Sequence, residues 1–457
     1  MSTHPGELTS RSRDAWALAM LREARGDRLP RPLAVVFPRS TDDVAHTLTW
    51  ASETGTAVVP RGGGSGVCGG AQAIWRGIVL DLSRMDRVLE VDREAQTVRA
   101  QAGIRGDRLE NELSESELTL GHYPQSLAIS SLGGWIAAAS AGQASAGYGA
   151  IEDHLEGLTA VLGSGEVLEL PAVPRSATGP DLRRLFVGSE GTLGVVTEAT
   201  LSVIRRPDSL RWLAVAPSAF PAGVELTREL VQRRLHPVVV RLYDEVDAGL
   251  TFGPVGHGGG PVAIAAFDAS AVGEAGLEDA RRLALESGAG PLGEDYGRHW
   301  WGHRNDAVAL YRRIMGEERM FGPGVIVDTM EVAGTWTGIP RLYDAVREAL
   351  LERASQAVGC HLSHPYGSGA SLYFTFLIRA EDDAVAERTY LEAWKQAAAA
   401  TASAGGTVSH HHGIGLLKAP FLAEELGPGA MSALRAIKAA LDPSGILNPG
   451  KLLQTEA

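Results

Sequence analysis

The sequence predicts an α+β protein made of two parts with different local patterns. Strand and helix signals intermix up to about residue 205, where Arg205-Arg206-Pro207 marks a boundary. Beyond it, residues 208–430 carry longer helical stretches between strands, a pattern typical of helices packed on an antiparallel sheet. A length of 457 residues also favours more than one domain.

In the first part, residues 12–25 predict an amphipathic lead-in helix, and Asp42 and Asp43 open a second helix over 44–53. A hairpin is predicted over 158–170, because a Gly-Ser-Gly turn separates two runs of β-forming residues. Strands are predicted at 33–38, 57–60, 77–81, 88–91 and 97–100.

The second part predicts helices over 274–285, 341–357 and 383–402, with strands at 212–215 and 372–378. The segment 441–451 is a turn-rich closing stretch, and the sequence contains no internal repeat.

Composition excludes several classes of function. The chain has 42 Lys and Arg against 55 Asp and Glu, so a nucleic-acid or anionic-membrane partner is not expected. Two cysteines, Cys68 and Cys360, are too few for a disulfide framework and fit a reducing compartment. Because no stretch approaches the roughly 20 apolar residues of a membrane helix, and no signal segment or peroxisomal address is present, we expect a cytoplasmic protein.

A glycine-rich loop follows the strand at 57–60 and holds six glycines between positions 62 and 70. Gly64, Gly66 and Gly69 satisfy the dinucleotide fingerprint G-x-G-x-x-G, but a new strand begins near Gly77 and leaves no room for the helix that fingerprint requires. A Rossmann unit is therefore not predicted. Backbone N–H groups in such a loop can still approach a pyrophosphate closely.

Two more segments rich in small residues follow, at 126–142 and 187–196. The first places hydroxyls and a Gly-Gly pair before a helix of nearly bare alanines, against which a flat ligand can pack. Each loop alone has an ordinary structural explanation. Together, three such loops predict a large phosphate-bearing cofactor.

Three consecutive histidines, His410, His411 and His412, lie between two glycine-containing turns. Imidazole suits proton transfer near neutral pH. Because neighbouring residues of a strand point to opposite sides, we expect one or two of the rings to face a site. A solvated loop is the alternative interpretation.

The three loops, in this order, resemble the FAD-binding domain of the vanillyl-alcohol oxidase/FAD-linked oxidase superfamily, and with residues 443–451 the resemblance covers nearly the whole chain. It implies a two-subdomain FAD-binding domain of the p-cresol methylhydroxylase (PCMH) type and an α+β cap domain with an antiparallel sheet. The implied boundaries are 1–29 for a helical lead-in, 30–206 for the FAD domain, 207–430 for the substrate (cap) domain and 431–457 for a segment returning to the FAD domain.

By this resemblance the pyrophosphate of FAD lies on Arg61–Gly66. FAD is expected to be non-covalent, since the residues after the loop, Ser65-Gly66-Val67-Cys68, include no histidine for attachment. The implied FAD-binding residues are Pro60, Arg61, Gly62, Gly63, Gly64, Ser65, Gly66, Ser126, Ser130, Ser131, Gly133, Gly134, Ala138, Ala139, Ser140, Ala141, Glu190, Gly191, Thr192, Gly194, Val195, Val196 and Asn448.

Two branches of the superfamily compete. D-2-hydroxyacid dehydrogenases carry a divalent metal, but at 364–374 and 409–413 this sequence has a tyrosine in place of a ligand histidine and a histidine in place of the ligand glutamate. No metal is therefore expected.

The sequence is more similar to the alkyl-dihydroxyacetone-phosphate synthase-like branch. The matches lie at 121–124, 133–135, 148–153, 241–244, 369–374 and the histidine triplet. That resemblance implies that Tyr373 transfers a proton, while His122, Arg241 and His410–His412 position substrate and flavin. Glu317 stands where the synthases place a phosphate-binding arginine, and the candidates to replace it are Arg312, Arg313 and Arg319.

We expect an FAD-dependent enzyme that oxidises a CH–OH group of a small polar alcohol or hydroxy acid by hydride transfer to flavin N5. Tyr373, His411 or His412 can be the base, although an ordinary tyrosine pKa of about 10 would have to be lowered. Arg241 can hold a carboxylate. The alternatives are a redox-neutral synthase that exchanges an acyl for an alkoxy group and a non-catalytic flavin-binding protein. The sequence leaves the oligomeric state open, and a homodimer is one of the alternatives.

Overall fold

The computed structural model describes residues 1–353 and 357–453. By its internal contacts the chain divides into two compact units. The first comprises residues 1–142, 150–206 and 411–457, and the second comprises 143–149 and 207–410. Each unit is described by itself below.

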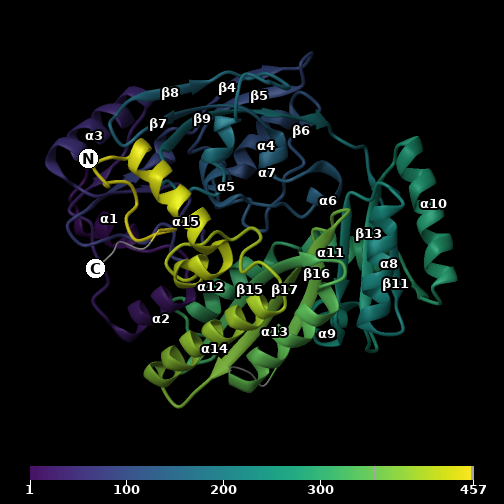
Figure 1. Ribbon diagram of the computed structural model, residues 1–457. Coiled ribbons are helices and arrows are strands. Elements are labelled where there is room, and N and C mark those ends of the chain that lie inside the picture. Colours follow the sequence, from purple (N-terminus) through teal and green to yellow (C-terminus); the bar gives the residue numbers. More distant parts are fainter. Residues whose placement is uncertain (354–356, 454–457) are drawn as a thin grey trace. The chain divides into compact units, whose positions relative to one another are not determined.

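The first unit contains two main sheets (Figure 1). The smaller is parallel, in the order β1 (Val35–Val36), β3 (Ile78–Asp81), β2 (Val58–Arg61). The larger is antiparallel, in the order β4-β5-β9-β7-β8, and a short pair joins β10 to β6. These strands are β4 (Val88–Asp92), β5 (Thr97–Gln101), β6 (Leu118–Thr119), β7 (Leu155–Val161), β8 (Val167–Leu170), β9 (Val195–Ser202) and β10 (Ile204–Arg205).

The helices of this unit are α1 (Pro5–Ser10), α2 (Ala17–Arg25), α3 (Thr41–Thr54), α4 (Gly106–Ser114), α5 (Leu132–Ala138), α7 (Ile151–His154) and α15 (Leu422–Leu441). Helix α3 begins where the acidic pair predicts, because the Ser40 hydroxyl accepts a hydrogen bond from Asp43 N, and it ends at Gly55 in the left-handed conformation. Its apolar positions Val44, Leu48 and Ala51 join the core formed by β5, β7 and β9.

The single lead-in helix expected over 12–25 is wrong. The chain forms α1 and α2, with a non-helical stretch between them. The reason is the buried Asp14, whose carboxylate accepts hydrogen bonds from Trp16 N and Ala71 N. These bonds hold residues 11–16 out of helical geometry.

The predicted hairpin at 158–170 is confirmed, since β7 and β8 pair in antiparallel register from Leu158–Leu170 to Val161–Val167. The predicted absence of a helix after the glycine loop is also confirmed, because residues 62–77 connect β2 to β3 without one.

The second unit is built on one seven-stranded antiparallel sheet, in the order β14-β11-β13-β12-β16-β17-β15. Its strands are β11 (Leu210–Ala216), β12 (Val239–Tyr243), β13 (Val262–Asp268), β14 (Gly290–Leu292), β15 (Val325–Thr335), β16 (Val358–Ser363) and β17 (Gly369–Arg379). Its helices are α6 (Ser145–Tyr148), α8 (Phe220–Gln232), α9 (Glu245–Phe252), α10 (Ala271–Glu286), α11 (Asp295–His303), α12 (Asp306–Met315), α13 (Ile339–Arg353) and α14 (Asp383–Ser403). Residues 354–356 of the helix predicted over 341–357 lie outside the described residues.

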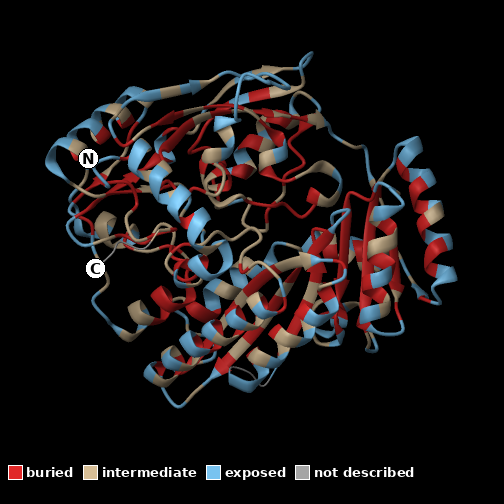
Figure 2. Cartoon of the chain, in the orientation of Figure 1, coloured by how far each residue is buried: buried red, intermediate tan, exposed pale blue. Residues whose placement is uncertain are grey.

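Side-chain alternation gives this sheet two different faces. Leu242, Leu362, Leu372 and Val332 occupy paired positions on one face and are fully buried. Helices α13 and α14 lie along that apolar face (Figure 1), and their buried residues appear as red stripes on otherwise exposed helices (Figure 2). The alternate positions of the same strands carry polar groups, which form the second face.

The α+β class and the antiparallel sheet of the second part expected from the sequence are both present. The boundary drawn from the sequence at 430/431 falls inside α15, whereas the contacts divide the chain at His410 and His411. Residues after His411 join the first unit because Leu416 N and Leu417 N both donate to Cys68 O, and Gly415 N donates to the Glu190 carboxylate.

Candidate active site

In the first unit, the glycine loop packs closely against residues 126–134. A Cβ atom on Gly63 would lie 1.9 Å from Ile129 O, and one on Gly62 would lie 2.0 Å from Ser131 Oγ. Both distances are impossible for real atoms, so these positions require glycine. The backbone N–H groups of residues 62–66 donate no hydrogen bond to any described residue. They are available to an anionic group.

A second loop, 188–192, is held against α5. Gly188 N donates to Ile136 O at 3.0 Å, and Glu190 N donates to Ala137 O at 2.8 Å. Ala139 at the end of α5 and Glu190 both have a positive φ angle, 50° and 51°, a conformation that residues other than glycine seldom adopt. Such backbone strain persists only where the surroundings hold it.

Two buried polar atoms beside these loops have no hydrogen-bond partner among the described residues: Ser131 Oγ and Asn448 Oδ1. The Asn448 amide nitrogen donates to Gly70 O and to Glu190 O at 2.9 and 2.7 Å, so this residue ties the closing segment to two of the loops. Unpaired buried polar atoms are costly and indicate a missing ligand group.

Other predicted cofactor residues make contacts within the protein. The Ser130 hydroxyl accepts from Trp135 Nε1 at 2.7 Å, and the Glu190 carboxylate accepts from Ile414 N and Gly415 N at 3.1 and 2.8–3.0 Å. Burial raises the pKa of Glu190 to about 7. These residues shape the loops through their side chains, and Val195 and Val196 are buried at the start of β9.

His122 is fully buried, with its Nε2 atom 3.2 Å from Ser140 Oγ and its ring edge-on to Trp135. Burial lowers its pKa to about 3, so the ring is neutral at physiological pH. His122 can therefore accept or donate one hydrogen bond, but it does not carry a charge.

In the second unit, the polar face of the sheet brings four ionisable side chains into one row across neighbouring strands. Tyr243, His361, Tyr373 and Glu331 are paired in register on β12, β16, β17 and β15. The His361 ring stacks on Tyr373, with centroids 4.8 Å apart and planes inclined by 18°. Of these four residues the sequence identified Tyr373 alone.

Arg241, two residues before Tyr243 on β12 and on the same face, contacts His361 directly. Its NH1 atom lies 2.9 Å from His361 Nε2, and His361 Nδ1 lies 2.7 Å from an oxygen of Asp247. Asp247 belongs to α9, where it follows the helix-capping Asp244. The signal for His361 in the sequence is the alternation Cys360-His361-Leu362-Ser363, which places His361 and Ser363 on the face opposite Leu362.

Tyr373 donates a hydrogen bond to Thr329 Oγ1 at 3.0 Å. The buried surroundings of its hydroxyl raise its pKa above the ordinary value of 10.0. Tyr373 is consequently neutral at physiological pH, and it is a weaker proton acceptor than the histidines unless substrate or flavin lowers its pKa.

The histidine triplet is divided between the units. His410 belongs to the second, where its Nε2 atom lies 2.9 Å from Tyr366 Oη, its ring stacks on His364 and its backbone N donates to Glu331. His411 and His412 belong to the first, with ring centroids 4.5 Å apart.

Family models match both parts of the chain. Residues 32–171 match the family model of the FAD binding domain, and residues 206–452 match that of the FAD linked oxidases, C-terminal domain. The chain belongs to the FAD-linked oxidases.

Relatives of this FAD-linked oxidase include proteins of more than one activity. Alkyldihydroxyacetonephosphate synthase of Trypanosoma brucei brucei is 32% identical over 96% of this chain and 75% of its own length. An uncharacterized FAD-linked oxidoreductase of Escherichia coli (strain K12), YgcU, is 31% identical over 94% of this chain and 90% of its own. Glycolate oxidase subunit GlcD of Bacillus subtilis (strain 168) is 28% identical over 93% and 90%.

A solved structure of alkyldihydroxyacetonephosphate synthase superposes with a TM-score of 0.82 at 25% identity, covering 99% of this chain and 83% of that chain. p-Cresol methylhydroxylase, at 15% identity and a TM-score of 0.78, shares the fold.

The family assigns FAD as the cofactor, and the first unit fits it. The N–H groups at 62–66 are free to bind a pyrophosphate, and the closely packed backbone leaves no side chain in its way. The unpaired atoms of Ser131 and Asn448 can bond polar atoms of the flavin ring. Two bonds from residues that the sequence did not single out hold the glycine loop. The Asp14 carboxylate accepts a hydrogen bond from Ala71 N, and Ala15 N donates to Gly66 O.

The three arginines considered as replacements at the Glu317 position are either bonded to a carboxylate or exposed. Arg319 forms two hydrogen bonds to the Asp383 carboxylate at 2.7 and 2.5 Å, Arg313 pairs with Glu318 at 3.0 Å, and Arg312 is exposed. None of the three is a buried, uncommitted partner for a phosphate.

Among the described residues, no group of three or more His, Cys, Asp and Glu side chains is arranged to hold a metal ion, and no helix has the length and apolar character that a membrane crossing requires. The prediction that the enzyme uses no metal stays a prediction.

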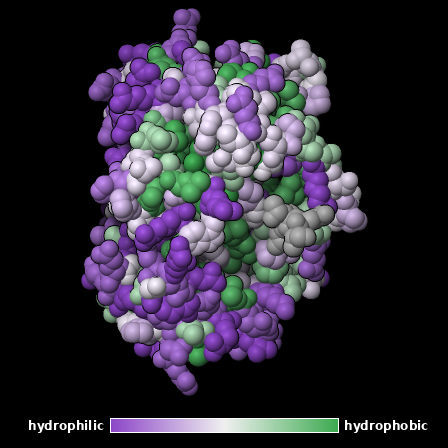
Figure 3. All heavy atoms as spheres, turned by 90° about the vertical axis from the view of Figure 1, so that its left-hand side faces the viewer, coloured by the Kyte–Doolittle hydropathy of each residue, from purple (hydrophilic) through white to green (hydrophobic). Residues whose placement is uncertain are grey.

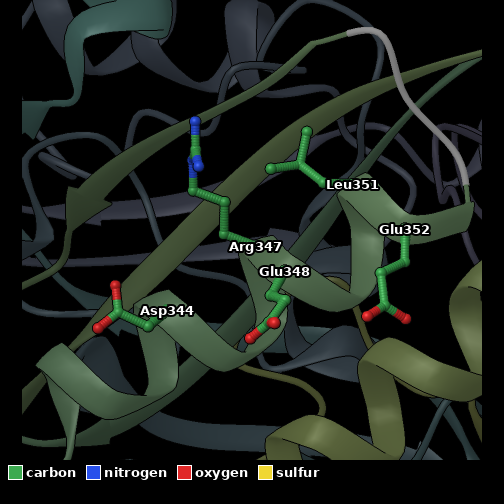
Figure 4. A pocket seen from close by; sticks show the side chains of 5 residues that line it. All are labelled: Asp344, Arg347, Glu348, Leu351 and Glu352. Atoms are coloured by element: carbon green, nitrogen blue, oxygen red, sulfur yellow. The ribbon is translucent and has the colours of Figure 1, made fainter.

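A cavity of about 510 Å³ lies on α13 and is lined by Asp344, Arg347, Glu348, Leu351 and Glu352 (Figure 4). All five side chains come from the helix on the apolar face of the sheet, away from Arg241 and Tyr373.

The surface view in Figure 3 shows polar side chains over much of one side, with apolar ones in small groups between them.

Proposed function

We propose that this FAD-linked oxidase oxidises the CH–OH group of a small hydroxy acid without a metal. Bound FAD supplies the hydride acceptor, at flavin N5. The protein's own residues bind the substrate, orient its carbon–hydrogen bond and remove the hydroxyl proton. The product is the corresponding 2-oxo acid or aldehyde, and an electron acceptor that the sequence does not name reoxidises the flavin.

The observation that carries this proposal is the buried Arg241 on the polar face of the cap sheet. It is 7% exposed, and its Nε atom has no partner among the described residues. A carboxylate satisfies a guanidinium well, because two oxygens match its fork of donors. Tyr373 on the same face can bond the substrate hydroxyl, and the base remains Tyr373, His411 or His412.

The second candidate is the redox-neutral alkyl-dihydroxyacetone-phosphate synthase reaction. The similarity to synthases over almost the whole chain favours it. Against it stands the loop at 312–319, where Glu317 replaces the expected arginine and Arg319 is bound to Asp383. A phosphate group would lack its usual partner there.

The deciding experiment follows the flavin spectrum of the purified protein anaerobically while lactate, glycolate, glycerol or fatty alcohols are added. We expect bleaching of the flavin band by a hydroxy acid. No bleaching by any alcohol, together with incorporation of fatty alcohol into acyl-dihydroxyacetone-phosphate, would establish the synthase instead. The cytoplasmic location, the non-covalent FAD and a homodimer stay predictions.

A further inference from the structure

Arg241 has an unusual environment for a buried arginine. Its NH1 atom bonds His361 Nε2 at 2.9 Å, its Nε atom is unpaired, and no described carboxylate forms a salt bridge with it. A buried cation without a counter-ion is unfavourable. The arrangement is therefore suited to an anion that arrives from outside.

The protonation state of His361 follows from its neighbours. A guanidinium can only donate, so His361 Nε2 must accept, and the ring proton sits on Nδ1, which faces Asp247 Oδ2 at 2.7 Å. Burial lowers the pKa of His361, which agrees with a neutral ring, although Asp247 acts in the opposite direction. The neutral imidazole separates Asp247 from Arg241, so the positive charge is held in place but is not cancelled by a direct ion pair.

Ser363 provides a second unpaired donor beside Arg241. The two residues are directly opposite each other on β12 and β16, so their side chains leave the same face. Ser363 is 1% exposed, and its hydroxyl has no partner among the described residues. Trp300 lies over the guanidinium at 5.1 Å and shields it from water.

Resting on the proposed oxidation, we propose that Asp247 and His361 are positioning residues that present Arg241 to the substrate carboxylate, with Ser363 as its second contact. The subsite takes a singly charged carboxylate rather than a phosphate dianion, because it offers one guanidinium that is not paired with a carboxylate. Glu331, buried on the same face two strands from His361, further disfavours a dianion.

The first test measures binding of pyruvate, a singly charged 2-oxo acid, to the FAD-loaded enzyme by isothermal titration calorimetry at constant ionic strength. His361→Leu keeps the side-chain volume but removes both bonds, and we expect affinity to fall about tenfold or more, as for a lost hydrogen bond to a charged group. His361→Gln, whose amide oxygen can accept from Arg241, should recover part of the loss. Asp247→Asn and Ser363→Ala should each weaken binding by about threefold or more.

The matched control is Asp244→Asn. Asp244 is a buried carboxylate at the start of the same helix, but it bonds Tyr343 and the helix backbone rather than His361. Pyruvate affinity should stay within about twofold of wild type in this variant. Unchanged affinity in His361→Leu, or an equal loss in Asp244→Asn, would overturn the proposal.

The second test compares lactate with 1,2-propanediol, which share a carbinol but differ in charge. In Asp247→Asn and His361→Gln the KM for lactate should rise more than kcat falls, and kcat/KM should fall more for lactate than for the diol. A general structural effect would lower kcat/KM for both substrates alike, and that result counts against a positioning role.

The two proposals can fail separately. Wild-type enzyme that binds pyruvate, with the expected variant effects, but oxidises no hydroxy acid supports the subsite and removes the proposed function. Enzyme that oxidises uncharged alcohols and binds no pyruvate keeps the oxidation and removes the subsite.

Discussion

At the scale of single residues, the chemistry of the two units depends on which protonation states burial allows. In the first unit His122 is neutral because burial lowers its pKa to about 3, and in the second Tyr373 stays protonated because burial raises its pKa. His361 is neutral because Arg241 can only donate to it. The positive charge that the polar face of the cap sheet offers to a substrate is that of Arg241, so recognition and proton transfer fall to different residues.

The role of Tyr373 can be tested with Tyr373→Phe. We expect kcat to fall by about 10²- to 10⁴-fold, the usual contribution of a proton-transfer group. The FAD content should stay at wild-type level, because Tyr373 belongs to the second unit and the FAD loops belong to the first.

Thr329→Val is the control, since it removes the hydroxyl that accepts from Tyr373 but keeps the tyrosine. It should cost far less activity than Tyr373→Phe. Turnover retained in Tyr373→Phe would exclude the proposed role and transfer it to His411 or His412.

At the scale of elements, the loops of the first unit depend on glycine for two reasons that the sequence does not distinguish. Gly62 and Gly63 are glycines because a Cβ atom would collide with Ser131 or Ile129. Gly66 meets only an oxygen of Asp14, 3.7 Å away, and its φ is not positive. A count of glycines therefore identifies the loop, but the packing decides which of them are indispensable.

This difference in packing predicts different effects on stability for two similar substitutions. Gly63→Ala should lower the melting temperature of the FAD-free protein, because the new methyl group overlaps Ile129 O and overpacking costs about 1–3 kcal/mol. Gly66→Ala should leave that melting temperature unchanged. Scanning calorimetry of both apoproteins checks the prediction, and equal melting temperatures would contradict the close packing of this loop.

At the scale of the whole molecule, the two units differ in how the chain builds them. All seven strands of the cap sheet come from residues 207–410. The first unit instead needs the closing segment, where Val58 N donates to Ile446 O and Asn448 N donates to Val58 O. Lys451 is buried and donates to Gln72 O at 2.7 Å, which adds a further link between distant parts of this unit.

We therefore expect residues 207–410 to fold when expressed alone, with cooperative unfolding and no bound flavin. Residues 1–206 expressed alone should not bind FAD, because the strand pairing and the Asn448 bonds are missing. Circular dichroism and the flavin absorption of the two fragments are the measurements. FAD binding by the 1–206 fragment would show that the closing segment is dispensable.

The sequence by itself determined the family, the cofactor and the two-part α+β organisation, because these depend on local patterns of glycine, small residues and strand alternation. It also predicted roles for Arg241 and Tyr373. It did not reveal Asp247, His361 or Ser363 as partners of Arg241, since these residues lie on α9 and β16, and only antiparallel register across β12 and β16 brings them together. It also placed the return to the first unit after residue 430, because the bonds of Gly415 and Leu416 to Glu190 and Cys68 span hundreds of residues and leave no local pattern. Local patterns specify elements, whereas pairing and burial between distant segments decide which side chains meet and which charges they keep.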